Sequence, residues 1–335
     1  MTVTVIDLQT FEPTDEATLR AWWEVGRAAS VERPFDAWPS WKAVRTKVAT
    51  PRNDGHAVRT AAVVDGRVVG ACSLWFFDLD NTHLAQVEIW VHPDARRRGV
   101  GTALLADAES CAASAGRTTV VATAFAPVGA ASPGSAFAAA RGYAVASLEE
   151  TKLLDLRRAP DGWGHLDDQV AAALGGYRVV GAEEAVPEEH VEDFCGLLSA
   201  FLGEVPTGDL DLTEVAWTRE RVRDTEERFR REGIVNVYAL AVAPDGHLCG
   251  FSDLRVRRDD PRHAEVGGTL VMPGHRGHRL GLAMKLGTHR RLLELFPGCE
   301  WVETGNAGVN AAMNAVNEQL GYRVVERALD LQKRL

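Results

Sequence analysis

Residues 87–105 read VEIWVHPDARRRGVGTALL, and residues 270–285 read LVMPGHRGHRLGLAMK. In both stretches an apolar run ends at Val-x-Pro, a loop of arginine and glycine follows, and a helical pattern then begins. A strand–loop–helix turn directs backbone N–H groups towards one point, and the helix N-terminus adds about half a positive charge. Glycines let a ligand approach the backbone closely. Each stretch therefore predicts an anion site suited to a phosphate or pyrophosphate.

The two stretches belong to a long internal repeat. Six features recur in one order, the first five 180 residues apart and the last 179: Asp65-Gly66 and Asp245-Gly246, Gly70 and Gly250, Val91-x-Pro93 and Val271-x-Pro273, Arg96 and Arg276, Gly101 and Gly281, Gly142-Tyr143 and Gly321-Tyr322. This spacing exceeds the periods of solenoid repeats and indicates two domains. We place the domains at residues 1–157 and 177–335, with a linker at 158–176 that contains a short helix.

Each copy has the same order of local patterns. A strand opens it (2–7; 177–182), and two helices follow (14–29 and 38–49; 187–203 and 213–232). A hairpin, a further strand, the glycine–arginine loop and its helix, a β-branched run, a small-residue helix and a last strand come next. The Asp65-Gly66 turn is typical of a type I′ hairpin. The order predicts an α+β fold, in which a mixed, mostly antiparallel twisted sheet is flanked by helices.

Composition narrows the function classes. The chain has 335 residues, with 37 Lys and Arg against 47 Asp and Glu, and the resulting net charge of -10 disfavours nucleic acid as a partner. The sequence contains no uninterrupted run of about 18 apolar residues, so we expect no membrane span. The five cysteines are scattered and form no CxxC pair, which argues against a disulfide scaffold or a zinc site. We expect a cytoplasmic protein without a metal, as a monomer or homodimer.

The motif Arg96-x-x-Gly99-x-Gly101, preceded by Val91-x-Pro93, resembles motif A of the GNAT superfamily of N-acetyltransferases. The two-copy layout is similar to tandem members of that superfamily, of the mycothiol synthase type and others that are uncharacterised. The resemblance implies that acetyl-CoA is the co-substrate and that the loops hold its pyrophosphate. It assigns cofactor binding to the following residues: Val91, Arg96, Arg97, Arg98, Gly99, Val100, Gly101, Thr102, Val271, Arg276, Gly277, His278, Arg279, Leu280, Gly281, Leu282 and Asn310.

The second copy departs from the motif at two places. Arg279 stands where the pattern has glycine, although Gly277 could compensate. In the resembling family, an Asn on the later helix contacts the pantetheine arm, a role that Asn310 fits. A Tyr on the same helix protonates the leaving thiolate, and Asn317 stands in its place as a candidate catalytic position. The first copy has Ala131 and Ala138 at these two positions, so we expect it to be catalytically degenerate.

Some family members carry a glutamate base six residues before the strand-end Val, and this position is Glu265 in the second copy but Ala85 in the first. The even spacing predicts that Glu265 shares a strand face with Val271, whereas Glu88 faces away from Val91. We therefore predict that the second copy is catalytic and that Glu265 removes a proton from the acceptor amine.

Structural explanations stand beside these functional ones. Arg96–Arg98 could form a solvated turn, Glu265 could be an exposed strand carboxylate, and Asn310 could be a helix N-cap. Packing in a core or between domains is the favoured explanation for the tryptophans of the early helices: Trp22, Trp23, Trp38, Trp41 and Trp217. Asp209 and Asp211 either offer carboxylates to a cationic acceptor or belong to a solvated turn.

The leading functional hypothesis is an acetyl-CoA-dependent N-acetyltransferase that acts on the primary amine of a small cationic molecule. The alternatives are a non-catalytic acyl-CoA-binding or sensing protein and a protein lysine acetyltransferase.

Overall fold

The computed structural model describes residues 5–35, 38–159 and 163–335. The chain forms two compact units. Unit 1 consists of Met1–Leu148, Asp209–Thr213 and Ala328–Leu335, and unit 2 consists of Glu149–Gly208 and Glu214–Arg327. Two units agree with the repeat, but the contiguous domains expected from it do not match these ranges. The reason is strand pairing, because each unit completes its sheet with a segment from the other half of the chain.

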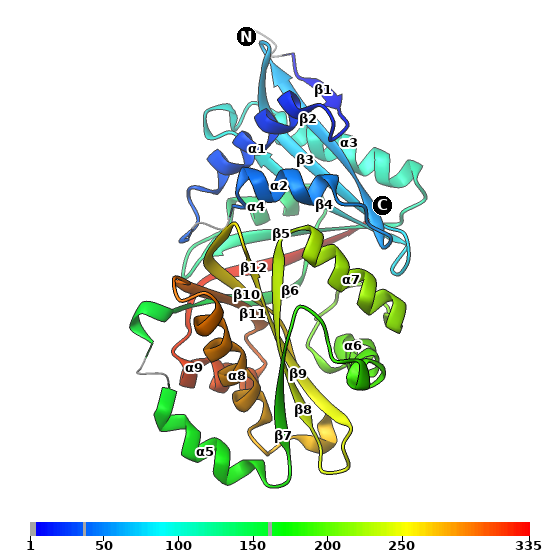
Figure 1. Cartoon of the computed structure of the whole chain (residues 1–335). Helices are drawn as coiled ribbons and strands as arrows, with labels where there is room; N and C mark the ends of the chain where they lie inside the picture. The colour runs from blue at the N-terminus through cyan, green and yellow to red at the C-terminus, as the bar shows by residue number, and fades with distance from the viewer. Residues whose placement is uncertain (1–4, 36–37, 160–162) are drawn as a thin grey trace. The chain divides into compact units, whose positions relative to one another are not determined.

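Unit 1 contains a sheet with helices on both faces (Figure 1). Its first four strands pair antiparallel in sequence order, and the fourth pairs parallel with the fifth. The strands are β1 (Asp7–Thr10), β2 (Gly55–Val64), β3 (Arg67–Phe77), β4 (Leu84–Val91) and β5 (Thr119–Pro127), with residues 144–148 of β6 and 328–334 of β12. The helices are α1 (Glu16–Ser30), α2 (Trp41–Ala49), α3 (Val100–Ser114) and α4 (Pro133–Ala139). Side chains of α1 and α2 pack on one face, and those of α3 and α4 on the other. Residues 2–4 of the expected first strand lie outside the described residues.

Unit 2 repeats this architecture. Strand β10 pairs antiparallel with β9 and parallel with β11, β8 pairs with β7 and β9, and β11 pairs with residues 149–155 of β6. The strands are β7 (Arg178–Glu183), β8 (Ile234–Val242), β9 (Leu248–Arg257), β10 (Asp260–Val271) and β11 (Trp301–Ala307), with residues 149–155 of β6 (Ala144–Asp155) and residues 323–327 of β12 (Arg323–Arg334). The helices are α5 (Gly164–Leu174), α6 (Val191–Glu204), α7 (Arg219–Arg231), α8 (Leu280–Leu295) and α9 (Ala311–Leu320). Helices α6 and α7 cover one face, and α5, α8 and α9 cover the other. The expected linker helix is α5, and residues 160–162 of that linker lie outside the described residues.

The two hairpin turns differ in detail. Asp65 and Gly66 have φ values of 50° and 74°, as a type I′ turn requires. In the equivalent turn of unit 2, residues 243–247, only Gly246 has a positive φ, of 96°, and its N–H donates to the Ala243 carbonyl. Pro244 holds its own φ near −65°, so this hairpin uses a longer turn.

The parallel strand pairs position the site in each unit. Strands β4 and β5 pair at three residue pairs only, from Leu84–Thr119 to Gln86–Val121. Strands β10 and β11 pair at three as well, from His263–Trp301 to Glu265–Glu303. All four strands continue beyond the last pair without further mutual pairing. The strands therefore diverge towards the ends at which the two glycine–arginine loops begin.

Candidate functional site

The two loops, loop 1 (residues 92–99) and loop 2 (residues 272–279), share one backbone path. Each begins with a short 3-10 turn and then has left-handed residues at the same two positions. In loop 1 these are Arg97 and Gly99, with φ values of 63° and 89°. In loop 2 they are Gly277 and Arg279, with φ values of 90° and 53°. Arginine and glycine have exchanged places, and the departure at Arg279 therefore leaves the loop geometry intact.

Both loops deliver a helix N-terminus. The first intrahelical hydrogen bonds run from Ala103 N to Gly99 O and from Ala283 N to Arg279 O. The preceding N–H groups have no intrahelical acceptor, as at any helix start. They belong to Val100, Gly101 and Thr102 in unit 1 and to Leu280, Gly281 and Leu282 in unit 2. The Val100, Leu280 and Leu282 side chains are buried in the cores, so these residues can offer a phosphate only their backbones.

Two of the predicted arginines stabilise the loops. Arg96 Nη1 donates to both carboxylate oxygens of Glu32, at 2.9 and 3.1 Å, and Arg96 Nε donates to Val91 O at 3.4 Å. Arg276 Nη2 donates to Glu204 Oε2 at 2.6 Å, and its Nε donates to Val271 O at 3.0 Å. Each side chain ties its loop to the preceding strand end. Arg97 and Arg98 are exposed.

The space beside the loops differs between the units. A Cβ added at Gly277 or Gly281 would meet no atom within 4 Å. A Cβ at Gly101 would lie 3.4 Å from the Phe137 ring of α4. Thr102 Oγ1 accepts a hydrogen bond from Arg141 at 2.5 Å. Gly277 and Gly281 therefore border open space, whereas Phe137 of α4 packs against the start of α3 at Gly101.

A β-bulge changes the position of Glu265. Glu265 pairs with Arg255 on β9, and Val271 pairs with Gly250. Between these two pairs β10 therefore contains one more residue than β9. The irregularity falls at Gly267, between two regular stretches. Paired residues share a face, so Glu265 lies on the α6–α7 face, whereas Val271 packs against α8. The prediction that the two share a face was wrong, because counting assumes an unbroken period of two.

Glu265 lies at the last residue pair before β10 and β11 diverge. Its side chain reaches solvent, but the surrounding protein desolvates it and raises the pKa of its carboxyl group. Glu303 and Asp253 raise this pKa further, while Arg255 and His263 oppose them. Among the described residues it has no hydrogen-bond or ion-pair partner. It is thus an available proton acceptor at the vertex of the opening.

The corresponding carboxylate of unit 1 lies on the equivalent face. Glu88 pairs with Ser73, and β4 shows no register shift. Its neighbour on the same face, Trp90, packs with α1 and α2. By register the counterpart of Glu265 is Gln86, paired with Trp75, and not Ala85. Strand faces therefore do not distinguish the two copies, and the prediction that Glu88 and Glu265 lie on different faces was wrong.

Helix α9 holds the two predicted asparagines. Asn310 is the N-cap, and its Oδ1 accepts from Met313 N at 3.2 Å, as the structural explanation proposed. Asn317 is fully buried: its Oδ1 accepts from Lys285 Nζ at 2.7 Å, and its Nδ2 donates to Asn306 Oδ1 at 3.0 Å. Lys152 Nζ donates to the same Asn306 oxygen at 3.1 Å. The sequence did not predict that Lys152 and Lys285 act on this network, because β6 and α8 are far apart in sequence.

Burial lowers the pKa of Lys285 to about 7, and Lys152 acts in the same direction. The unfolded chain, with an ordinary lysine pKa of about 10.5, binds more protons between these values, so stability should rise with pH across this window. We expect the free energy of unfolding of the wild type, relative to Lys285→Met, to increase from pH 7 to pH 9.5 in denaturant titrations. Parallel pH profiles would contradict a buried, titrating Lys285.

Asp209 and Asp211 belong to unit 1. Asp211 O lies 2.9 Å from His83 Nε2, and Asp211 Oδ2 accepts from Thr119 Oγ1 at 3.4 Å. Asp209 N donates to Ala146 O at 2.8 Å. These contacts anchor the segment within unit 1.

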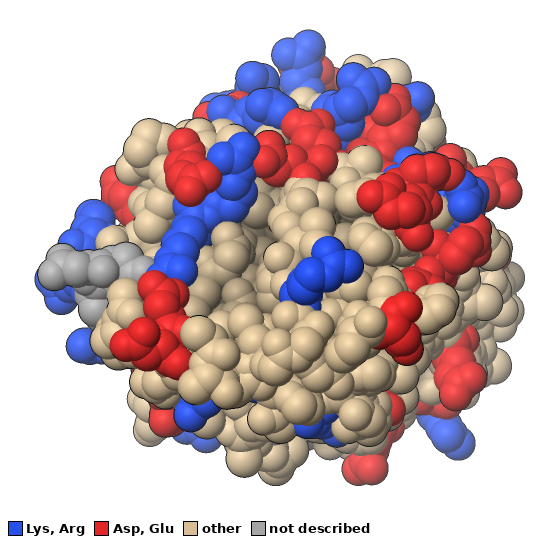
Figure 2. Space-filling model, turned by 60° about the horizontal axis from the view of Figure 1, so that its bottom comes forward, with Lys and Arg blue, Asp and Glu red and all other residues tan. Residues whose placement is uncertain are grey.

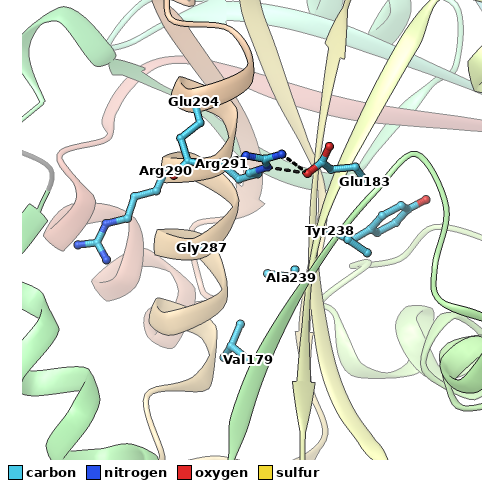
Figure 3. A pocket seen from close by; sticks show the side chains of 10 residues that line it. Val179, Glu183, Tyr238, Ala239, Gly287, Arg290, Arg291 and Glu294 are labelled. Atoms are coloured by element: carbon cyan, nitrogen blue, oxygen red, sulfur yellow. Dashed lines mark hydrogen bonds and ion pairs between the residues drawn. The ribbon is translucent and has the colours of Figure 1, made fainter.

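A pocket of about 350 Å³ lies between α8 and strands β7 and β8 (Figure 3). Gly287 faces Ala239 across it, and the small residues create the hollow. Its two arginines are neutralised, because Arg291 pairs with Glu183 at 2.6 Å and Arg290 with Asp167 at 2.9 Å. None of the predicted site residues lines this pocket.

The surface drawn in Figure 2 mixes charges of both signs around a mostly uncharged centre. Within the described ranges, no three or more His, Cys, Asp or Glu residues are placed to share a metal ion. No helix in the described part of the chain is both long and apolar enough to span a membrane.

Comparison with known protein families gives one match in each copy of the repeat. The sequence model described as Acetyltransferase (GNAT) family matches residues 16–132 and 205–322. A tandem GNAT protein from the clavulanic acid biosynthesis pathway, solved without AcCoA, is 28% identical with a TM-score of 0.82, over 98% of both chains. A GCN5-related N-acetyltransferase from Sphaerobacter thermophilus is 17% identical with a TM-score of 0.69, over 98% of this chain and 95% of that one. No curated protein sequence matches significantly.

Proposed function

The chain belongs to the acetyltransferase (GNAT) family, and from this premise we propose that unit 2 transfers the acetyl group of acetyl-CoA to the primary amine of a small cationic molecule. The observation that carries the proposal is the bulge at Gly267. The bulge determines which face of β10 carries Glu265, at the last residue pair before β10 and β11 diverge. The Glu265 carboxyl group has a raised pKa and no partner among the described residues.

Different residues of unit 2 bind acetyl-CoA, accept the proton and polarise the carbonyl. The amides of loop 2 and of the α8 N-terminus bind the diphosphate of acetyl-CoA, which supplies the thioester. Glu265 accepts one proton from the acceptor ammonium, directly or through a water, because only the neutral amine has a lone pair. The amine nitrogen then bonds to the thioester carbon, and the carbon–sulfur bond breaks. The second proton lost by nitrogen ends on the departing sulfur. Strand amides near Val271 polarise the carbonyl.

Thiol release with a panel of amines tests the proposal. We expect release with acetyl-CoA and at least one cationic primary amine, and a mass gain of one acetyl group on that amine. Binding of acetyl-CoA with no release for any amine would favour a binding or sensing protein. Acetylated lysines on added proteins, without small-molecule products, would favour a protein acetyltransferase.

Gly281 provides a test of loop 2. Gly281→Asp should raise the Kd for acetyl-CoA at least tenfold, because it places a negative charge at the helix N-terminus beside the diphosphate. Gly281→Ala is the matched control, since its Cβ would meet open space, and it should bind within about twofold of the wild type. Isothermal titration gives both constants. Equal constants for the two variants would contradict diphosphate binding at this loop.

A further inference from the structure

The pocket between α8 and strands β7 and β8 is lined at positions where unit 1 carries longer side chains. Strand register gives the first comparison, because Gly70 and Gly250 are equivalent in the repeat. Two residues before their partners on the preceding strand stand Thr60 on β2 and Ala239 on β8. The fold therefore places Ala239 of unit 2 where unit 1 has Thr60.

Two further positions beside this one differ in the same direction. On the neighbouring edge strand, the paired residue is Thr10 in unit 1 and Gly181 in unit 2. On the covering helix, Asp107 of α3 and Gly287 of α8 stand 180 residues apart, the spacing of the repeat. In unit 1, Thr60 Oγ1 donates to Asp107 Oδ2 at 3.4 Å. Three longer side chains of unit 1 are thus reduced to hydrogen or methyl in unit 2.

Packing does not explain these small residues. Gly287 is exposed in the interior of α8, where glycine is less favourable than alanine. A Cβ at Gly287 would lie 3.7 Å from Ala239 Cβ and 3.9 Å from Val179 Cγ1, which is ordinary contact. Alanine would therefore fit, and glycine keeps open a hollow of about 350 Å³. That volume is within the range of small-molecule sites.

The edge strand offers unpaired backbone groups at the pocket. Glu184 N donates to Asn236 O at 2.8 Å, so the even-numbered residues of β7 make the bonds to β8. The N–H and C=O of Gly181 therefore point away from β8. Among the described strands, β7 pairs with β8 alone. Glycine within a strand often marks a close approach of a ligand.

Charged groups surround the apolar floor. Figure 3 shows Arg291 pointing towards Glu183, to which its Nε donates at 2.6 Å, while its Nη1 donates to Glu294 Oε2 at 2.6 Å. Arg290 pairs with both carboxylate oxygens of Asp167, at 2.9 and 3.1 Å. Three carboxylates thus share two guanidinium groups. Among the described residues, Glu183 Oε2 and Glu294 Oε1 have no partner, so the rim attracts a cation.

We propose that this pocket of unit 2 binds a small organic cation, a primary ammonium on a compact apolar body. The body fills the hollow against Val179, Ala239 and Gly287, and the ammonium donates to the open carboxylate oxygens of Glu183 and Glu294. Val179 and Ala239 pack with α8, on the opposite face of the sheet from Glu265. The bound cation is therefore a ligand additional to the acetyl acceptor.

Cyclohexylammonium is the probe, with cyclohexanol and cyclohexanecarboxylate as neutral and anionic analogues of the same shape. In the full chain labelled with ¹⁵N-glycine, the amide resonances of Gly181 and Gly287, assigned by Gly→Ala substitution, should shift on titration. The analogues should shift neither resonance. Gly268, which faces Phe201 of α6, reports separately on the side of the sheet that carries Glu265. The measurement requires no acetyl transfer, so it is independent of the proposed activity.

Filling the hollow tests its location. Gly287→Leu should raise the Kd for cyclohexylammonium about tenfold or more, measured at the Gly181 resonance, because the new side chain occupies the pocket. Gly196→Leu is the matched control. Gly196 is likewise an exposed glycine inside a helix, α6, and its Cβ would meet no atom within 4 Å. This variant should bind as the wild type does. Leucine favours helix, and circular dichroism checks that both variants fold.

Removal of one rim charge tests the class of ligand. Glu183→Gln should raise the Kd about threefold or more, since a charge-assisted hydrogen bond is lost. Glu192→Gln on α6, whose carboxylate pairs with Arg219 at 2.9 Å, is the control and should leave the Kd unchanged. The proposal is overturned if cyclohexylammonium moves neither pocket resonance, if Gly287→Leu binds as the wild type does, or if cyclohexanol binds equally well.

Discussion

Glu265→Gln should lower the turnover of acetyl transfer by about 10²-fold or more, the usual contribution of a positioned general base. The glutamine keeps the shape of the side chain but cannot take a proton. Because its surroundings raise the pKa of Glu265, the wild-type rate should fall with decreasing pH at a pH above the ordinary glutamate range. The variant should lose this acidic limb. Steady-state rates across pH measure both effects, and isothermal titration should show unchanged acetyl-CoA affinity.

Glu303→Gln is the matched control for that experiment. Glu303 pairs with Glu265 across β10 and β11 and raises its pKa, so its removal should move the acidic limb to lower pH while the base stays in place. A loss in Glu265→Gln no larger than that in Glu88→Gln would contradict the assignment of catalysis to unit 2.

Gly267→Ala should destabilise the protein by about 1–3 kcal/mol, the usual cost of overpacking, and should lower acetyl transfer at least tenfold. The new Cβ would overlap Asp253 Oδ2 and would lie 2.5 Å from Arg255 Nη2. Both neighbours are held in place, because Asp253 is buried and ion-paired with Arg255. Relief of the clash would disturb the bulge and move Glu265. Denaturant titration and turnover at saturating substrate measure the two losses.

Gly298→Ala serves as the control for this substitution. Its Cβ would meet no atom within 4 Å, so stability should change by no more than about 0.5 kcal/mol. Gly267→Ala with wild-type stability and turnover would show that the bulge is not needed.

The repeated loop motif predicted the fold because it couples a strand end to a helix start, and both loops formed at the predicted residues. The sequence also identified Arg279 as an irregularity, but its effect could not be predicted. An arginine can adopt a left-handed conformation at a modest local cost, and only the structure shows that Gly277 holds the other such position.

The face of Glu265 could not be obtained by counting. Period-two counting fails when one residue is added, and Gly267-Gly268 within a strand was the available signal of a bulge. The contacts of Asp211 and Lys285 depend on segments distant in sequence. A sequence pattern describes one segment at a time, so neither contact could be predicted from it.

The division of the chain affects how the protein is made. Residues 328–335 belong to unit 1, where Leu331 fills its core and Leu335 N donates to Thr118 O at 2.9 Å. A ribosome that has delivered residues 1–148 has therefore not yet supplied the whole of that unit. Unit 1 can therefore be completed only after residues 328–335 have been translated, although its first residues are translated before those of unit 2.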